Sequence, residues 1–152
     1  MLVATGSLAA FALAGCVGAS NENEDATGGE GFETGGSFEL PTDPGDDDFA
    51  DRTGQDVMEV VTIQREADPQ FLFDPPFVRV DRGTTVRWVN VDGAFHTVTA
   101  TASLENRSAA DEFNTTIASE GDSFEWDADG TGRQDYYCSP HVGFMYGSVD
   151  VN

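Results

Sequence analysis

From Asp56 to the end of the sequence, short runs of alternating apolar and polar residues are separated by turn-forming pairs such as Pro75-Pro76 and Asp92-Gly93. Alternation with a period of two puts the apolar side chains on one face of a β-strand, and the pairs end each strand in a turn. The expected strands cover residues 58–65, 77–80, 84–90, 96–100, 123–126, 135–138 and 147–151. Residues 103–111 are expected to hold one or two helical turns at most. This density of short strands predicts an all-β fold, a Greek-key β-sandwich of about a hundred residues.

Residues 17–54 have a different composition, dominated by glycine, aspartate and glutamate, with few large apolar residues. A segment of this kind buries too little apolar surface to offset the entropy that it loses on ordering. We therefore expect three parts: a signal peptide at 1–15, a disordered, flexible acidic linker at 16–55, and the folded domain at 56–152. An acidic docking tail is the alternative interpretation of the middle part.

Residues 2–15 (LVATGSLAAFALAG) are uncharged, small and apolar, and they end directly before Cys16. This pattern resembles a lipoprotein signal peptide, whose cleavage leaves the cysteine as the lipid-bearing N-terminus. The alternatives are a short buried helix or a transmembrane anchor, although about fourteen apolar residues are few for crossing a bilayer. We expect an exported protein that lipidated Cys16 anchors to the outer face of the cell membrane. The first basic residue is Arg52, so the similarity to twin-arginine signals implies a true start upstream that carries an arginine pair.

The chain carries 28 acidic and 7 basic residues, and every basic residue is an arginine. Its formal net charge of −21 repels nucleic acid and anionic lipid headgroups. We therefore expect no nucleic-acid partner, a membrane contact through the N-terminal lipid only, and a soluble monomer. Abundant acidic residues without lysine also indicate a protein adapted to concentrated salt, where screening removes most of the self-repulsion.

The segment YYCSPHVGFM places Cys138, His141 and Met145 within eight residues. They can be explained without a metal, as two core residues and a loop histidine. The other histidine, His96, follows a glycine turn at the start of an expected strand, where a side chain can point to the end of a sheet. Two histidines, a thiolate and a more distant thioether form a trigonal set with a weak axial ligand, which suits copper in both oxidation states. The second cysteine is the distant Cys16, so a four-thiolate zinc site and iron–sulfur clusters are excluded.

The stretches YYCSPHVGFMYG and TVRWVNVDGAFHTV resemble those of the small blue (type 1) copper proteins of the cupredoxin superfamily. The lipoprotein-like signal that ends at Cys16, the acidic linker and the lysine-free domain are together most similar to the halocyanins, plastocyanin relatives of haloarchaea. The resemblance implies one copper ion bound by His96, Cys138, His141 and Met145. This sequence departs from the family pattern in the length of the ligand loop. Three residues separate His141 from Met145, one fewer than in plastocyanin-like loops and one more than in amicyanin-like loops. It also departs at Thr97, where the family commonly has an asparagine that helps tie the two ligand loops together.

The resemblance further implies an electron carrier and not an enzyme. It would shuttle single electrons between respiratory-chain components, with a membrane cytochrome complex, a terminal oxidase or a reductase as its redox partners. Two alternatives stay open on the residues alone. One is an extracellular copper-storage or chaperone protein, and the other is a cysteine hydrolase with a Cys138/His141 dyad.

A docking surface for the redox partner is expected around the ligand loop. Pro140, Val142 and Phe144 are apolar although they belong to a loop, and Ala94 and Phe95 stand near the other expected ligand. The position of Tyr137 resembles that of the aromatic residue that offers plastocyanin a second electron route. We expect these residues to form the electron-transfer surface.

Overall fold

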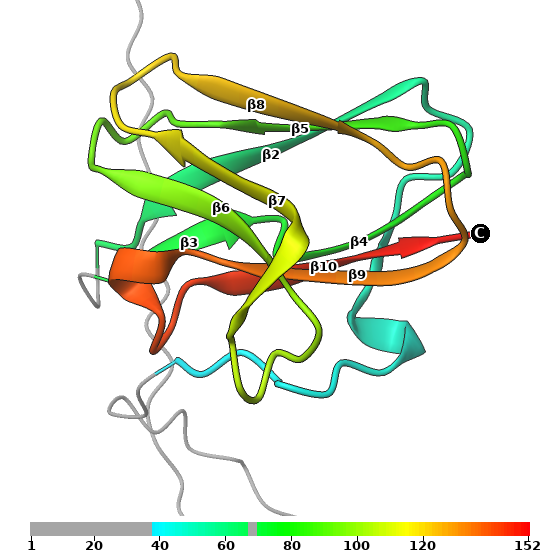
Figure 1. The fold of residues 1–152 in the computed structure, drawn as a ribbon, viewed down its shortest axis with the longest axis horizontal. Helices are drawn as coiled ribbons and strands as arrows, with labels where there is room; N and C mark the ends of the chain where they lie inside the picture. Colours follow the sequence, from blue (N-terminus) through cyan, green and yellow to red (C-terminus); the bar gives the residue numbers. More distant parts are fainter. Residues whose placement is uncertain (1–37, 67–69) are drawn as a thin grey trace, which may run out of the picture. The chain divides into compact units, whose positions relative to one another are not determined.

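The structure, a computed structural model, describes residues 38–66 and 70–152 and is a sandwich of two β-sheets (Figure 1). Its strands are β1 (Ala50–Asp51), β2 (Val57–Gln64), β3 (Phe71–Asp74), β4 (Phe77–Val80), β5 (Thr85–Val89), β6 (His96–Thr101), β7 (Ala109–Ile117), β8 (Ser123–Asp127), β9 (Gly132–Tyr137) and β10 (Tyr146–Val151). Two short 3-10 turns complete it, η1 (Asp46–Asp48) and η2 (Ser139–His141), and the described part of the chain contains no α-helix. The all-β prediction is confirmed. The expected signal peptide, Cys16 and the linker up to residue 37 lie outside the described residues.

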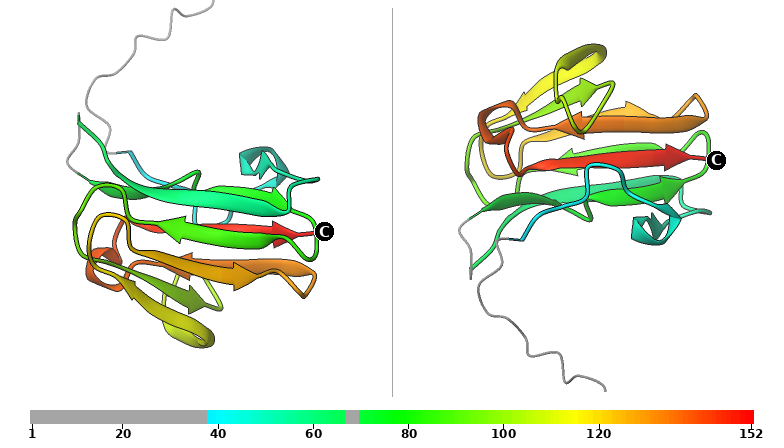
Figure 2. Two further views of the ribbon diagram at one scale, coloured as in Figure 1. Left: turned by 90° about the horizontal axis from the view of Figure 1, so that it is seen from above. Right: turned by 90° about the horizontal axis from the view of Figure 1, so that it is seen from below.

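The first sheet has the strand order β1-β4-β10-β9-β6-β7 and the second has the order β3-β2-β5-β8. Figure 2 shows the two layers from above and from below. The chain crosses between them six times, from β1 to β2, from β3 to β4, from β4 to β5, from β5 to β6, from β7 to β8 and from β8 to β9. These crossovers are the Greek-key type of connection that the strand pattern predicts.

The antiparallel pairing of β6 with β9 positions the functional end of the sandwich. His96 is the first residue of β6, and Cys138 follows directly after the last residue of β9. Because the two strands run in opposite directions, the start of one and the end of the other lie at the same end of the sheet. η2 packs there against β6.

The core lies between the sheets and is filled by the alternating apolar residues. In β2 and β5 every second residue is buried, which puts Val60, Val86 and Trp88 in the interior. The Trp88 ring packs on the rings of Phe113, Phe124 and Tyr136 with centroid separations of 5.0–5.6 Å. Aromatic packing of this density gives the ligand-bearing strands a rigid base.

Residues 38–55 pack on the sandwich, so the prediction of a linker that extends to residue 55 was wrong for this segment. Leu40 is 8% exposed and belongs to a second apolar cluster with Leu72, Phe77, Leu104, Tyr137 and Tyr146. The Tyr146 hydroxyl donates to the Leu40 carbonyl, and β1 pairs in parallel with β4. A few widely spaced apolar residues in an acidic segment show no periodic pattern that would predict this packing. They are nevertheless enough to hold the segment on the apolar surface that the sandwich offers.

Besides β1 in the expected linker, two strands were not predicted from the sequence, β3 and β7. β3 is a run of three apolar residues before Asp74 and shows no alternation. β7 was not expected at all, and it begins within the last three residues of the segment for which we expected helical turns. β7 lies at the edge of its sheet and exposes Asp111 and Glu112. Charged residues on an exposed edge strand oppose further pairing, and they also hide the strand pattern. Of the one or two helical turns expected at 103–111, the structure has a single turn, in which the Arg107 N–H donates to the Ser103 carbonyl at 2.9 Å, before β7 begins at Ala109.

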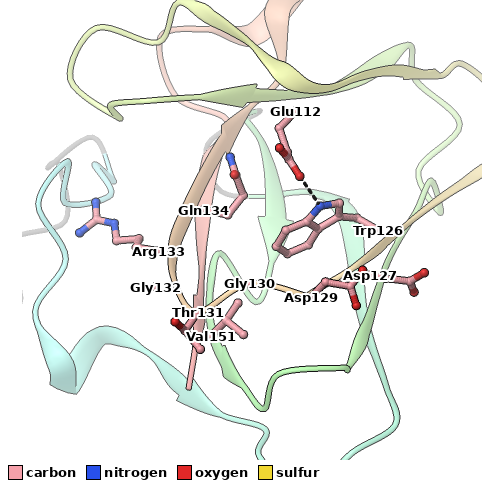
Figure 3. A pocket seen from close by; sticks show the side chains of 10 residues that line it. All are labelled: Glu112, Trp126, Asp127, Asp129, Gly130, Thr131, Gly132, Arg133, Gln134 and Val151. Carbon is pink, nitrogen blue, oxygen red and sulfur yellow. Dashed lines mark hydrogen bonds between the residues drawn. The ribbon is translucent and has the colours of Figure 1, made fainter.

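A cavity of about 240 Å³ lies where β8 turns into β9 (Figure 3). Glu112, Trp126 and Arg133 are among the residues that line it, and the Trp126 indole N–H donates to a Glu112 carboxylate oxygen at 3.2 Å. None of the predicted ligands lines this cavity. Nor do the described residues include a helix with the length and apolar character that crossing a membrane requires.

Candidate metal centre

Three predicted ligands, Cys138, His141 and Met145, come from the connection between β9 and β10. Pro140 lies within η2, where its fixed φ suits the tight turn. The Cys138 N–H donates to the Met145 carbonyl at 2.9 Å, and the Met145 N–H donates to the His141 carbonyl at 3.0 Å. These backbone hydrogen bonds close the loop on itself and fix the positions from which the side chains project.

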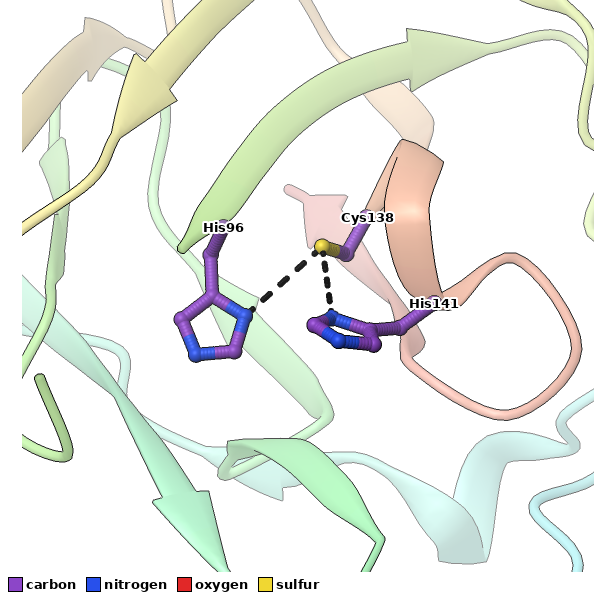
Figure 4. Close-up of side chains that lie close together, drawn as sticks. All are labelled: His96, Cys138 and His141. Atoms are coloured by element: carbon purple, nitrogen blue, oxygen red, sulfur yellow. Dashed lines mark hydrogen bonds between the residues drawn. The ribbon is translucent and has the colours of Figure 1, made fainter. Parts of the chain in front are cut away.

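His96, Cys138 and His141 bring their ligand atoms together at this end of the sandwich (Figure 4). The Cys138 Sγ lies 3.7 Å from Nδ1 of His96 and 3.3 Å from Nδ1 of His141. One ligand atom from each of the three residues lies within 4.8 Å of the others. Donors bound to one ion at about 2.0–2.3 Å in a trigonal plane are roughly 3.5–4 Å apart. The three side chains therefore fit a single metal ion.

The donors differ in their exposure to solvent. His96 and Cys138 are fully buried, whereas His141 is half-buried at the end of the molecule. Burial raises the pKa of the Cys138 thiol, and hydrogen bonds from Thr97 and His141 partly oppose this shift. Burial and the neighbouring His96 lower the pKa of His141. At neutral pH His141 is thus ready to bind as a neutral imidazole, whereas the thiol must lose a proton to bind as a thiolate.

Thr97 ties the two ligand-bearing segments together, although it replaces the asparagine expected from the family pattern. Its hydroxyl accepts a hydrogen bond from the Ser139 N–H at 2.8 Å, and its own N–H donates to the Cys138 Sγ at 3.4 Å. Thr99 lies next to it, with the two hydroxyl oxygens 3.1 Å apart. The contact orients the cysteine sulfur before any metal binds.

Met145 is fully buried and belongs to the same apolar core cluster as Cys138. Its backbone takes part in the loop-closing hydrogen bonds on both sides. With the shortened spacing from His141, the methionine is therefore still buried in the core cluster that contains Cys138.

Aromatic and apolar side chains surround the imidazoles. The Phe71 ring lies 5.0 Å from the ring of His96 and 4.8 Å from that of His141, and the Phe144 ring lies 5.7 Å from His141. These rings restrict the orientation of both imidazoles and keep water from their faces. Phe71 was not predicted from the sequence, because β3 was not expected as a strand.

The expected electron-transfer surface is only partly exposed. Val142 is 44% exposed, Phe95 is 54% exposed, Pro140 is also exposed, and Phe144 is half-buried. Tyr137, by contrast, is 6% exposed and packs in the second apolar cluster. Its assignment to the surface was wrong, because the side chain on that face of β9 is covered by Leu40 and Tyr146.

Asp92 is a polar neighbour of the site that sequence analysis treated only as part of a turn. Its carboxylate oxygens lie 2.9 and 3.1 Å from Nε2 of His96, the ring nitrogen that faces away from Cys138. The sequence signal was an acidic residue four positions before a predicted ligand. An Asp-Gly pair is so common in turns that this signal does not stand out.

Comparison with known proteins agrees with this geometry. Residues 59–152 match a family described as copper binding proteins of the plastocyanin/azurin family. Halocyanin from Natronomonas pharaonis is 39% identical over 108 residues, which cover 70% of this chain and 63% of the halocyanin. The chain thus spans less than two thirds of that relative. The solved structure of a novel purple cupredoxin from Nitrosopumilus maritimus matches with a TM-score of 0.53 at 26% identity, over 62% of this chain and 98% of the cupredoxin.

The family match covers both segments that bear the candidate ligands, from β2 through β10. The fold and the two-histidine, one-cysteine cluster agree with it. The chain therefore belongs to the copper-binding proteins of the plastocyanin/azurin family, and copper is its cofactor.

Proposed function

We propose that this protein is a carrier of single electrons with one type 1 copper ion. His96 and His141 would bind through Nδ1 and Cys138 through Sγ, with Met145 as the weak axial ligand. Copper bound there would accept and release one electron. The observation that carries the proposal is the convergence of the three strong donors, 3.3 and 3.7 Å from sulfur to each nitrogen, in a frame of strands and closed loops.

Fast electron transfer requires that the ligands move little when the oxidation state changes. The backbone hydrogen bonds of the ligand loop and the Thr97 bridge hold the donors in one arrangement. A preorganised set of this kind suits both Cu(I) and Cu(II), whereas a loose set would rearrange on each transfer. The protein contributes this rigidity.

The exposed apolar residues next to His141 support a docking role for this end of the sandwich. Val142 and Pro140 lie on the ligand loop, and Phe95 lies beside His96. We propose that a redox protein docks briefly on this patch, with electrons entering through His141. The strongly negative chain would favour partners with a basic surface around their own redox centre.

Burial argues against the two alternative functions. A copper store or chaperone needs an exchangeable site, but His96 and Cys138 are fully buried. A cysteine hydrolase needs an accessible thiolate. The Cys138 Sγ lies within 3.3 Å of the His141 Nδ1, yet the sulfur is buried and its pKa is raised, so it is a poor nucleophile.

We also propose that the protein is exported and anchored at the outer face of the membrane through Cys16. The apolar segment before Cys16 supports this, and the similarity to halocyanin supports a location outside the cytoplasm. Its electron donors and acceptors would then be membrane-bound respiratory proteins.

The test is to load the full chain with Cu(II), record its visible spectrum and cycle it by voltammetry. We expect an intense blue colour from the thiolate, bleaching on reduction, and full recovery on reoxidation without loss of metal. C138S should abolish the colour because it removes the thiolate. A colourless complex, or metal lost on reduction, would contradict the electron-carrier proposal and favour storage.

The same measurement tests the axial role of Met145. M145Q should lower the reduction potential because an amide oxygen favours Cu(II), and M145L should raise it because no donor replaces the thioether. Both proteins should keep their blue colour. Equal potentials in the two variants would show that Met145 is a packing residue only.

A further inference from the structure

Asp92 lies in the connection between β5 and β6 and contacts the buried ligand His96 at Nε2, the ring nitrogen that faces away from Cys138. Its two carboxylate oxygens lie 2.9 and 3.1 Å from Nε2 of His96. The side chain of His96 is 0% exposed and that of Asp92 is 9% exposed. The carboxylate and the imidazole thus meet where little water can screen the charge.

The turn holds the carboxylate in place independently of the histidine. Asp92 Oδ1 accepts a hydrogen bond from the Ala94 N–H at 2.8 Å, and Gly93 takes a φ of 75°, which favours glycine. Asn90 braces the same turn: its side chain donates to the Ala94 carbonyl at 2.6 Å and accepts from the Gly93 N–H at 2.9 Å. The carboxylate is therefore aimed at His96 by the fold.

We propose that Asp92 is a positioning residue for the copper site and sets its reduction potential. By accepting the proton on Nε2, the carboxylate holds the His96 tautomer in which the free lone pair is on Nδ1, the nitrogen that faces the Cys138 Sγ. This inference rests on the copper site proposed above. It concerns the tuning of that site and adds no ligand.

The carboxylate acts on the potential in one direction. A hydrogen bond to a carboxylate increases the electron density on the imidazole and makes it a stronger donor. A stronger donor and a nearby negative charge both stabilise Cu(II) more than Cu(I), because Cu(II) carries the larger positive charge. Asp92 therefore lowers the reduction potential below the value that His96 would give with a neutral partner.

A purely structural role would have a different signature. Asp92 already caps the turn through the Ala94 N–H, and asparagine can keep that hydrogen bond through its own Oδ1. It can also accept from Nε2, but without the negative charge. D92N therefore separates the electrostatic contribution of the carboxylate from its contribution to the loop.

The experiment compares copper-loaded full-length wild type with D92N and with E120Q as the matched control. Glu120 is an exposed carboxylate whose Cβ lies near Gly93, in the neighbouring loop. All three proteins should be blue. In D92N the ratio of Cu(II) to Cu(I) affinity should fall about tenfold, which raises a one-electron potential by about 59 mV. E120Q should shift it much less, because its carboxylate is exposed and screened.

A second readout uses wild-type protein alone and does not depend on the stability of D92N. In the diamagnetic Cu(I) form, the Nε2 proton of His96 should give a slowly exchanging NMR signal shifted downfield by the carboxylate. A blue D92N protein with the potential of E120Q, or a wild-type protein without that proton signal, would overturn the role of Asp92. Failure of wild type to take up copper as a blue complex would instead overturn the proposed function.

Discussion

Copper and a proton compete for the Cys138 sulfur, so the protonation of this residue controls the copper affinity of the site. Burial raises the pKa of its thiol above the ordinary value of 9.0, so the metal-free protein carries a neutral thiol through the neutral range. His141 behaves in the opposite way, because burial lowers its pKa below 6.5 and leaves the ring neutral. Of these two ligands, only Cys138 therefore has to lose a proton when copper binds near neutral pH.

The apparent Cu(I) affinity should thus rise about tenfold per pH unit between roughly pH 7 and pH 8.5. In this window His141 is already deprotonated and the thiol is still protonated, so the slope reports one proton. Competition with a Cu(I) chelator of known affinity at each pH measures it. An affinity that does not change with pH across this window would mean that the metal-free protein already holds a thiolate.

The ligands themselves were predictable from the sequence, and their neighbours were not. With two histidines and one cysteine in the domain, the candidate ligands had few competitors. Asp92 and Phe71 are ordinary residue types whose roles depend on distances set by the fold, and Thr97 stood out only because the family pattern has an asparagine at its position. Residues that orient a ligand leave no sequence pattern, because any element that passes the site can supply them.

At the scale of elements, the segment before β1 contributes to the stability of the sandwich. Leu40 fills the second apolar cluster, and Phe38 and Leu40 line a cavity together with Gly143 and Phe144 of the ligand loop. Arg65 lies over the Phe38 ring, 4.2 Å from its centroid. The segment therefore lies across this cavity from the loop that carries His141.

Replacing Leu40 by alanine should lower the free energy of unfolding by about 2 kcal/mol, from lost apolar burial and a residual cavity. E39A is the matched control, because Glu39 is the exposed neighbour and its side chain should contribute little. Denaturant unfolding of both metal-free variants measures the difference. Equal stability of the two would mean that residues before β1 contribute little to the folded state.

The strands that alternate cleanly were predicted well, and the ones with other constraints were not. β4 was expected at 77–80 and lies there, whereas β3 and β7 were missed. β3 buries two adjacent residues, Leu72 and Phe73, one in each apolar cluster, which removes the period of two. β3 thus lacks the single buried face that alternation reveals, whereas β7 buries Phe113 and Ile117 on one face but carries the charged residues of an edge strand.

At the scale of the whole molecule, the excess of negative charge is the main feature that bears on the stability of the folded state. The formal charge of −21 leaves most carboxylates without an arginine partner, and several of the ion pairs are exposed, such as Arg87 with Glu125. Exposed pairs contribute little, while the summed repulsion among like charges acts against the compact state. Salt should therefore stabilise this protein more than it stabilises a neutral one.

The melting temperature should rise between dilute buffer and molar potassium chloride, by roughly 4 °C for each kcal/mol of repulsion that screening removes. The triple variant D47N, D111N and E120Q neutralises three exposed carboxylates and should start from a higher melting temperature in dilute buffer, with a smaller rise. Differential scanning calorimetry at several salt concentrations measures both. The same rise in wild type and variant would point to a general salt effect on burial.

β10 lies between β4 and β9, directly after the loop that Cys138 and Met145 close. A chain that emerges from its N-terminus has completed every other strand before β10 appears, and until then β4 and β9 have no partner between them. His96, Cys138 and His141 all precede β10, and the pairing of β6 with β9 can already bring them together, but the loop closes only when the Cys138 N–H reaches the Met145 carbonyl. Copper that arrives before β10 is in place would therefore meet the three strong donors without the closed loop that holds them in one arrangement.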